Sequence, residues 1–144
     1  MKARDLMTRS PELIEADRPV VEAARRMRDL DVGALPVCDE QRRLLGMITD
    51  RDITLRITAE GKDPASTSVR DAMSKELVTC GEDDDVVHLA RLMQERHVRR
   101  VPIVRKAAQG GEAPGDIVGI VSLDDLATDL RVSDLVARTL ARTV

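Results

Sequence analysis

The chain contains the same arrangement of residues twice. Four segments of the first copy, residues 4–7, 20–27, 32–37 and 45–52, return in order as residues 70–73, 86–93, 98–103 and 118–125. The offset is 66 residues for the first three segments and 73 for the last, because the second copy carries a longer loop at residues 107–115. Internal repetition of this kind indicates a duplicated structural unit, so we expect two copies of one small α/β unit.

Each copy is expected to follow the order β-α-β-β-α, which makes the fold class α+β. Apolar residues at helical spacing follow Val20 and Val86, and short apolar segments predict the strands. Short strands are expected to open at residues 13–14 and 77–78. The other expected strands are residues 35–38 and 44–48 in the first copy and 101–104 and 117–121 in the second. Asp17 and the acidic run 82–85 precede the long helices, where a helix N-terminus favours capping oxygens and negative charge.

The repeat also predicts the domain boundaries. Domain 1 is expected at residues 1–62, a polar linker at residues 63–68 and domain 2 at residues 69–130. Residues 131–144 place apolar side chains on one face of a predicted amphipathic helix or tail. This segment has two interpretations: it packs on its own domain, or it forms a contact between two copies of the chain.

The composition excludes several classes of function. The chain has no Phe, Tyr or Trp, so it lacks the aromatic side chains on which single-stranded nucleic acids stack. Its net charge of −3 provides no overall attraction to DNA or to an anionic membrane. No apolar segment reaches membrane-spanning length, and residues 1–5 lack the apolar stretch of a secretory signal. We therefore expect a cytoplasmic protein that binds neither nucleic acid nor membrane.

The third strand of each copy leads into a helix through a shared spacing of three residue types. These are Gly46, Thr49 and Asp52 in the first copy and Gly119, Ser122 and Asp125 in the second. A glycine lets a ligand approach the backbone, and a hydroxyl at a helix start lies beside N–H groups that favour phosphate. A carboxylate one turn later can accept hydrogen bonds from both hydroxyls of a ribose. The alternative is structural: the hydroxyls cap their helices, and the aspartates are ordinary first-turn acids.

These motifs, in order and twice, resemble a pair of cystathionine β-synthase (CBS) domains, a tandem often called a Bateman module. The strongest parts are residues 33–37 followed by residues 45–52, and residues 98–104 followed by residues 119–125. The resemblance covers residues 3–130. It implies two units related by a pseudo-twofold axis, with two clefts that hold AMP, ADP, ATP or S-adenosylmethionine as ligands, and no required cofactor.

The resemblance also implies which residues bind the ligand. Asp52 and Asp125 would hold the ribose, and Thr49 and Ser122 would lie near ribose or phosphate. The other residues implied to line the clefts are Val32, Gly33, Ala34, Val98, Arg99 and Arg100 beside the second strands, and Ile14 and Val78 at the first strands.

The two implied clefts differ. The second copy has Arg99 and Arg100 where the first has Gly33 and Ala34, and guanidinium groups suit phosphate oxygens. A phosphorylated ligand should therefore favour the cleft that the arginines face. The alternative is that these arginines form surface ion pairs, for example with Glu95 or Asp124.

No enzyme is predicted, because none of the common catalytic or dinucleotide-binding motifs is present. We expect no metal site, because the histidines and cysteines lie in different elements without close ligand spacing. Cys38 and Cys80 are expected to be reduced thiols rather than a disulfide. The predicted function is a regulatory nucleotide-sensing module that forms a homodimer and is read by an unknown effector protein. The alternative is a structural, partner-binding dimerisation module without a nucleotide.

Overall fold

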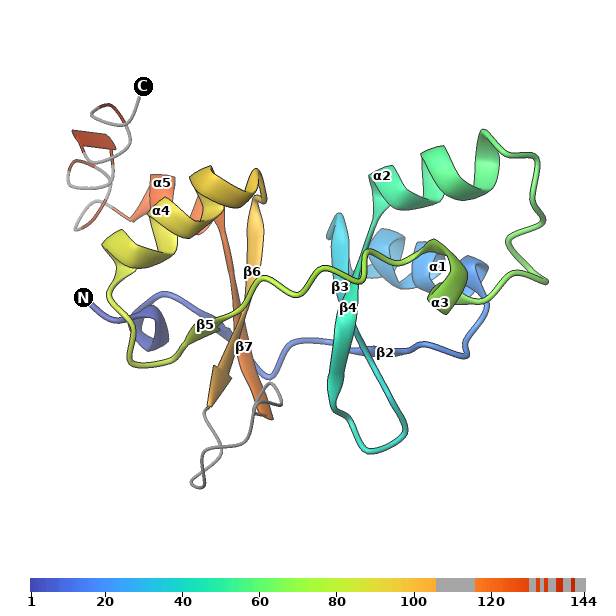
Figure 1. The fold of residues 1–144 in the computed structure, drawn as a ribbon, viewed down its shortest axis with the longest axis horizontal. Helices are drawn as coiled ribbons and strands as arrows, with labels where there is room; N and C mark the ends of the chain where they lie inside the picture. The colour runs from blue at the N-terminus through green and yellow to red at the C-terminus, as the bar shows by residue number, and fades with distance from the viewer. Residues whose placement is uncertain (106–115, 130–131, 133, 135–136, 139–140, 142–144) are drawn as a thin grey trace. The chain divides into compact units, whose positions relative to one another are not determined.

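The computed structural model describes residues 1–105, 116–129, 132, 134, 137, 138 and 141. The chain forms two compact units (Figure 1), one made of Glu12–Leu77 and the other of Met1–Pro11 together with Val78–Val144. We call them the central unit and the terminal unit. Each combines a small sheet with helices, which confirms the predicted α+β fold class.

The central unit contains a three-stranded sheet. In chain order its elements are β2 (Ile14–Glu15), α1 (Val20–Leu30), β3 (Ala34–Cys38), β4 (Leu44–Thr49), α2 (Asp50–Ile53), the π-helical turn η2 (Thr54–Thr58) and α3 (Val69–Ala72). The strand order is β2-β3-β4, with β2 parallel and β4 antiparallel to β3. All five residues of β3 are buried, because this strand lies in the middle of the sheet. Helix α1 buries Val20, Ala23 and Met27, which are spaced so that they share one helix face.

The terminal unit contains a four-stranded sheet. Its elements are the 3₁₀ turn η1 (Ala3–Asp5), β1 (Thr8–Arg9), β5 (Cys80–Gly81), α4 (Val86–Arg96), β6 (Arg100–Arg105), β7 (Asp116–Ser122) and α5 (Leu123–Thr128). The strand order is β1-β7-β6-β5, and only the β5–β6 pair is parallel. Strand β5 begins at Cys80 rather than at the predicted residues 77–78. Cys80 pairs with Ile103 of β6 and thus takes the place that Ile14 has in β2.

The two long helices begin differently. The Asp85 side chain caps α4 by accepting a hydrogen bond of 2.8 Å from the Val87 N–H, as the acidic run predicted. The prediction that Asp17 caps α1 was wrong. The N-cap of α1 is Pro19, and backbone carbonyls of residues 64 and 67 accept from the first two N–H groups of the helix. Asp17 instead lies 3.4 Å from the Arg70 guanidinium.

The compact units do not coincide with the repeats as they are read along the chain. Met1–Pro11 contains the start of the first repeat but lies in the terminal unit, where the Ala3 N–H donates to the Asp84 carbonyl at 2.8 Å and Thr8 pairs with Ile120 of β7. Ser74, the residue of the second repeat that corresponds to Thr8, pairs with β4 in the central unit. The edge of each third strand is therefore covered by the first segment of the other repeat.

Two predictions lie outside the described residues. The longer loop of the second copy, residues 107–115, is one of them. The amphipathic helix expected at residues 131–144 is the other, because only single residues of that segment are described. No helix in the described part of the chain is long and apolar enough to cross a membrane.

Candidate functional site

A reciprocal pair of hydrogen bonds closes the start of the short helix in each unit. In the central unit the Asp52 N–H donates to Thr49 Oγ1 and the Thr49 N–H donates to Asp52 Oδ2, both at 3.0 Å. In the terminal unit the Asp125 N–H donates to Ser122 Oγ at 3.1 Å, and the Ser122 N–H donates to Asp125 Oδ2 at 2.7 Å. Both arrangements are capping boxes. The structural role that the sequence left open is thus present in both units.

The backbone N–H groups at the start of α2 already have partners. The Asp50 N–H donates to the Gly33 carbonyl at 2.9 Å, the Arg51 N–H to Asp50 Oδ1 at 2.9 Å and the Asp52 N–H to the Thr49 hydroxyl. A phosphate at a helix N-terminus needs such donors free. The expectation that the backbone N–H groups at the start of α2 bind a phosphate is therefore wrong.

The same strand-to-helix contact recurs in the terminal unit with arginines. The Leu123 N–H donates to the Arg99 carbonyl at 2.7 Å, and Arg100 is the sheet partner of Ser122. In the part of the chain that the structure describes, the side chains of Arg99 and Arg100 form no ion pair or hydrogen bond. The ion pairs with Glu95 or Asp124 that the sequence allowed are therefore absent there.

The remaining predicted ligand residues are unequally accessible. Ala34 lies opposite the threonine of the capping box in the β3–β4 pair, so the structure brings the two together. Val32 is 39% exposed, whereas Ile14 is completely buried in the core of the central unit. Val78 and Val98 are partly buried against the core of the terminal unit. The structure thus brings Gly33 and Ala34, or Arg99 and Arg100, to the capping box of their unit. It leaves the Ile14 side chain no access to a ligand.

In both units, the space beside the glycine of the shared motif is occupied by another part of the chain and is not open to a ligand. A Cβ atom at Gly46 would collide with the backbone carbonyl of Ser74, which accepts a hydrogen bond of 3.1 Å from the Met47 N–H. At Gly119, a Cβ atom would lie 2.5 Å from the sulfur of Met7. The expectation that these glycines let a ligand approach the backbone is corrected, because another part of the same unit fills each space.

The described surface also contains a polar pocket of about 240 Å³ in the central unit. Its lining residues are Glu15, Ala16, Asp17, Cys38, Asp39, Glu40, Gln41 and Arg70. None of them is a predicted ligand residue, so this pocket was not predicted from the sequence. Half of its lining residues are acidic.

The repeated unit matches the model of a known domain family. The model of the CBS domain matches residues 3–59 and again residues 69–131. The chain belongs to the CBS domain family. Its two CBS domains form a tandem pair, as the resemblance implied.

Several known proteins resemble this CBS pair over most of its length. The CBS domain-containing protein YhcV of Bacillus subtilis is 40% identical over 126 residues, which cover 88% of this chain and 83% of that protein. A crystal structure of Hypoxic Response Protein I with two coordinated zinc ions has a TM-score of 0.78 and 32% identity, covering 90% of this chain and 99% of that one. The CBS domain pair of protein MJ0100, in complex with 5′-methylthioadenosine and S-adenosyl-L-methionine, has a TM-score of 0.75 and 26% identity, covering 88% of this chain and 93% of that one.

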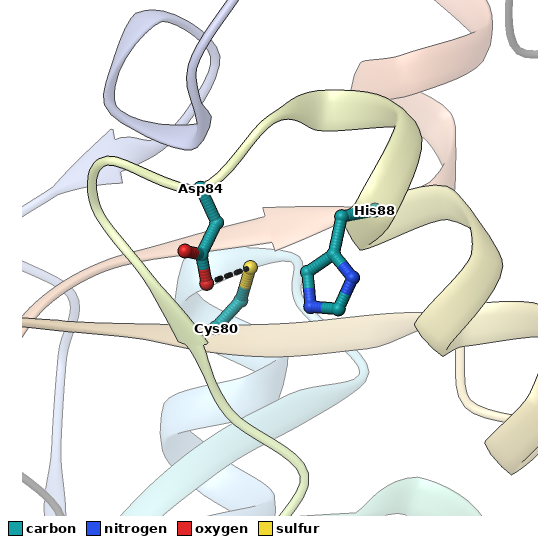
Figure 2. A group of neighbouring side chains, drawn as sticks. All are labelled: Cys80, Asp84 and His88. Carbon is teal, nitrogen blue, oxygen red and sulfur yellow. Dashed lines mark hydrogen bonds between the residues drawn. The ribbon is translucent and has the colours of Figure 1, made fainter.

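Both cysteines of the CBS pair are free and buried. Burial raises the pKa of the Cys38 thiol, and burial together with the nearby Asp84 carboxylate raises the pKa of Cys80 to about 12. The Cys80 thiol donates to Asp84 Oδ2 at 3.3 Å, and His88 lies on the other side of the sulfur (Figure 2). This group was not predicted from the sequence, although Cys80, Asp84 and His88 follow one another at intervals of four residues.

Proposed function

We propose that this CBS pair is a regulatory module that senses an adenosine-containing compound: AMP, ADP, ATP or S-adenosylmethionine. The observation that carries the proposal is the repeated capping box, which fixes a carboxylate beside the end of a sheet strand in both units. The complex of the MJ0100 CBS pair with 5′-methylthioadenosine and S-adenosyl-L-methionine supports this ligand class. The proposed activity is binding, and no catalytic step is part of it.

Asp52 and Asp125 are the proposed ribose-binding residues. In each, Oδ2 accepts a backbone N–H within the capping box, which holds the carboxylate in one orientation. No described residue donates a hydrogen bond to the other oxygen, Oδ1. A carboxylate is an acceptor only, so that oxygen and its remaining lone pairs suit the two hydroxyl donors of a ribose. The capping role and the binding role are therefore compatible in one side chain.

The two units are proposed to contribute unequally to the binding of a phosphorylated ligand. Arg99 and Arg100 stand beside the capping box of the terminal unit and have no ion-pair partner among the described residues. Gly33 and Ala34 offer no cation at the equivalent place in the central unit. A phosphate should thus be bound by the terminal unit, because guanidinium forks bind phosphate oxygens with two parallel hydrogen bonds.

A thermal-unfolding screen tests the proposal. The chain is heated with AMP, ADP, ATP, S-adenosylmethionine and, as controls, guanine nucleotides and NAD, and unfolding is followed by far-ultraviolet circular dichroism. A ligand at a hundredfold excess over its dissociation constant stabilises the folded state by about 2.7 kcal/mol. The double variant Asp52→Ala/Asp125→Ala should lose this response. A full response in the double variant would reject the assignment of these two residues.

The conservative variants Asp52→Asn and Asp125→Asn separate binding from capping. An asparagine side-chain carbonyl can still accept the N–H of Thr49 or Ser122, so the helix start is preserved. The negative charge and one acceptor oxygen are lost, so ligand affinity should fall while the unliganded protein unfolds at nearly the wild-type temperature. Equal losses of stability and affinity would mean that these residues act only as caps.

The alternative is a structural module that dimerises and binds a partner protein without a nucleotide. It is favoured by the fact that both capping boxes are closed by the chain itself. We propose a homodimer under either function, with an effector protein that responds to the state of the module. Light scattering coupled to gel filtration measures the assembly with and without ligand. If no compound shifts the unfolding temperature and the dimer is present throughout, the structural function holds.

A further inference from the structure

We propose that Cys80, Asp84 and His88 form a binding site for one zinc ion in the terminal unit. The Cys80 sulfur, a carboxylate oxygen of Asp84 and an imidazole nitrogen of His88 all lie within 4.8 Å of one another. Figure 2 shows the three side chains converging from β5, from the loop that follows it and from the first turn of α4. This site is separate from the two capping boxes and from the proposed nucleotide function.

The distances suit a tetrahedral zinc ion after small side-chain movements. Zinc binds sulfur at about 2.3 Å and nitrogen or oxygen at about 2.0–2.1 Å, so two of its ligand atoms lie about 3.5 Å apart. Cys80 and Asp84 already meet this requirement, because the thiol lies 3.3 Å from Asp84 Oδ2. His88 is exposed on the helix surface, so its ring can rotate to bring a nitrogen closer to the Cys80 sulfur and the Asp84 carboxylate.

The two ligands nearest the core are held in place by the fold. Cys80 is 3% exposed and fixed by the pairing of β5 with β6. The Asp84 carboxylate accepts the Gly81 N–H at 2.8 Å as well as the Cys80 thiol. A Cβ atom at Gly81 would come within 3.2 Å of that carboxylate, so the glycine provides the room in which it lies. The metal would therefore meet a largely preformed pair of ligands and recruit the histidine.

The chemistry of the three groups selects zinc over the hard cations. Thiolate and imidazole bind zinc well, whereas calcium and magnesium require mostly oxygen ligands. Binding replaces the thiol proton, which is released to the solvent, and the thiolate and carboxylate together neutralise the two positive charges of the ion. Three protein ligands leave a fourth position for water, and the ion ties β5 to the first turn of α4.

The first repeat shows that the fold itself does not require these residues. The equivalent positions in the central unit are Ile14, Arg18 and Glu22. Ile14 is a core residue, and the Arg18 guanidinium and Glu22 carboxylate form an ion pair at 4.0 Å. The same strand, loop and helix are thus built with an aliphatic side chain and a salt bridge. The metal-binding set belongs to the second repeat alone.

Titration of the tag-free, reduced full chain with Zn²⁺ and with Co²⁺ tests the proposal. We expect one equivalent of Zn²⁺ to bind and to raise the unfolding temperature. Co²⁺ should give a sulfur-to-metal charge-transfer band in the near ultraviolet and the strong visible bands of a tetrahedral ion. The absence of Trp, Tyr and Phe leaves that near-ultraviolet window free of protein absorption.

Matched variants assign the ligands. His88→Gln should weaken Zn²⁺ binding by more than about tenfold without affecting the fold, because His88 is exposed. Asp84→Asn should weaken binding as well, and Cys80→Ala should abolish the charge-transfer band. The controls are His97→Asn and Cys38→Ala, which remove the other histidine and the other cysteine. His97 has φ of 55° at the end of α4, a conformation that asparagine accepts.

The expected pattern is full binding in both control variants and weakened binding in all three ligand variants, each with the circular dichroism spectrum of the folded chain. The proposal is overturned if the wild-type chain binds no stoichiometric zinc. It is equally overturned if His88→Gln binds zinc as tightly as the wild type, or if the charge-transfer band disappears with Cys38→Ala instead of Cys80→Ala.

Discussion

The backbone carbonyl of Ser74 lies where the side chain of Gly46 would begin. Two backbone hydrogen bonds with Met47, of 3.1 and 2.8 Å, hold the Ser74 segment against β4. At the equivalent place in the terminal unit, Gly119 of β7 faces Met7 instead of a carbonyl. The two glycines of the shared motif are therefore packed against groups that differ in rigidity. The neighbour is a hydrogen-bonded backbone in one unit and a flexible side chain in the other.

Replacing Gly46 with alanine should destabilise the chain by about 1–3 kcal/mol, because the Ser74 carbonyl cannot move without breaking its hydrogen bonds. Gly119→Ala should cost less, because the Met7 Sδ and Cγ atoms can turn away and only Met7 Cβ, at 2.9 Å, requires a small backbone shift. Urea denaturation followed by far-ultraviolet circular dichroism measures both. The double variant Gly119→Ala/Met7→Ala should recover part of the stability lost in Gly119→Ala. If Gly46→Ala destabilises the chain no more than Gly119→Ala does, the Ser74 carbonyl is not the rigid obstacle described.

Removing either capping hydroxyl should weaken the start of its short helix. Thr49→Ala and Ser122→Ala are each expected to cost about 1 kcal/mol of unfolding free energy, since each leaves one aspartate N–H without its acceptor. Thr49→Ser retains the oxygen and serves as the control. Denaturation midpoints in the absence of ligand provide the measurement. A loss in Thr49→Ser equal to that in Thr49→Ala would show that the methyl group, and not the hydrogen bond, matters.

The chain should become less stable in alkali through its buried thiols, and Cys38 allows this to be measured. Burial raises the Cys38 pKa above its ordinary value of 9.0, so the folded state keeps a proton that the unfolded chain loses. This stabilisation is complete below the unfolded pKa and disappears as the pH rises through the folded one. Cys38→Ala should therefore lose less stability than the wild type between about pH 8 and about pH 10. Parallel losses would show that Cys38 titrates normally.

A charge placed on the N-terminal segment should damage the terminal unit and spare the central one. Ala3 has no exposed surface within the core of the terminal unit, so Ala3→Glu buries a carboxylate there. Amide hydrogen exchange should accelerate in β7 and leave β4 unchanged. Val69→Glu, at the equivalent position of the second repeat, is the matched variant and should accelerate exchange in β4. If Ala3→Glu accelerates amide hydrogen exchange in β4, the N-terminal segment does not belong to the terminal unit alone.

Local sequence signals predicted most of the elements. The helical spacing after Val20 and Val86 located both long helices at their first residues, because burial of one face is what stabilises them. The hydroxyl-to-aspartate spacing located the two short helices, because a capping box depends only on residues three apart. The family resemblance and the repeat then supplied the fold.

What the sequence could not supply depends on contacts between distant segments. The first segments of the two repeats carry similar residues, so nothing local indicates that Thr8 pairs with β7 and Ser74 with β4. The space at Gly46 is filled by a residue 28 positions away, which the motif itself does not indicate. The approach of Cys80 to Asp84 arises from the turn at Gly81, whereas composition suggested only a capping run.

The division of the chain also dictates an order of folding. Residues 12–77 are contiguous, so the central unit is complete as soon as they have left the ribosome. Strand β1 is synthesised before the central unit, whereas its partner β7 is synthesised after it. The N-terminal residues therefore have to stay unpaired while the central unit forms, and they join the terminal unit only when β7 emerges. A ribosome that stalls after residue 77 has emerged would therefore hold one finished unit and an unpaired β1 segment.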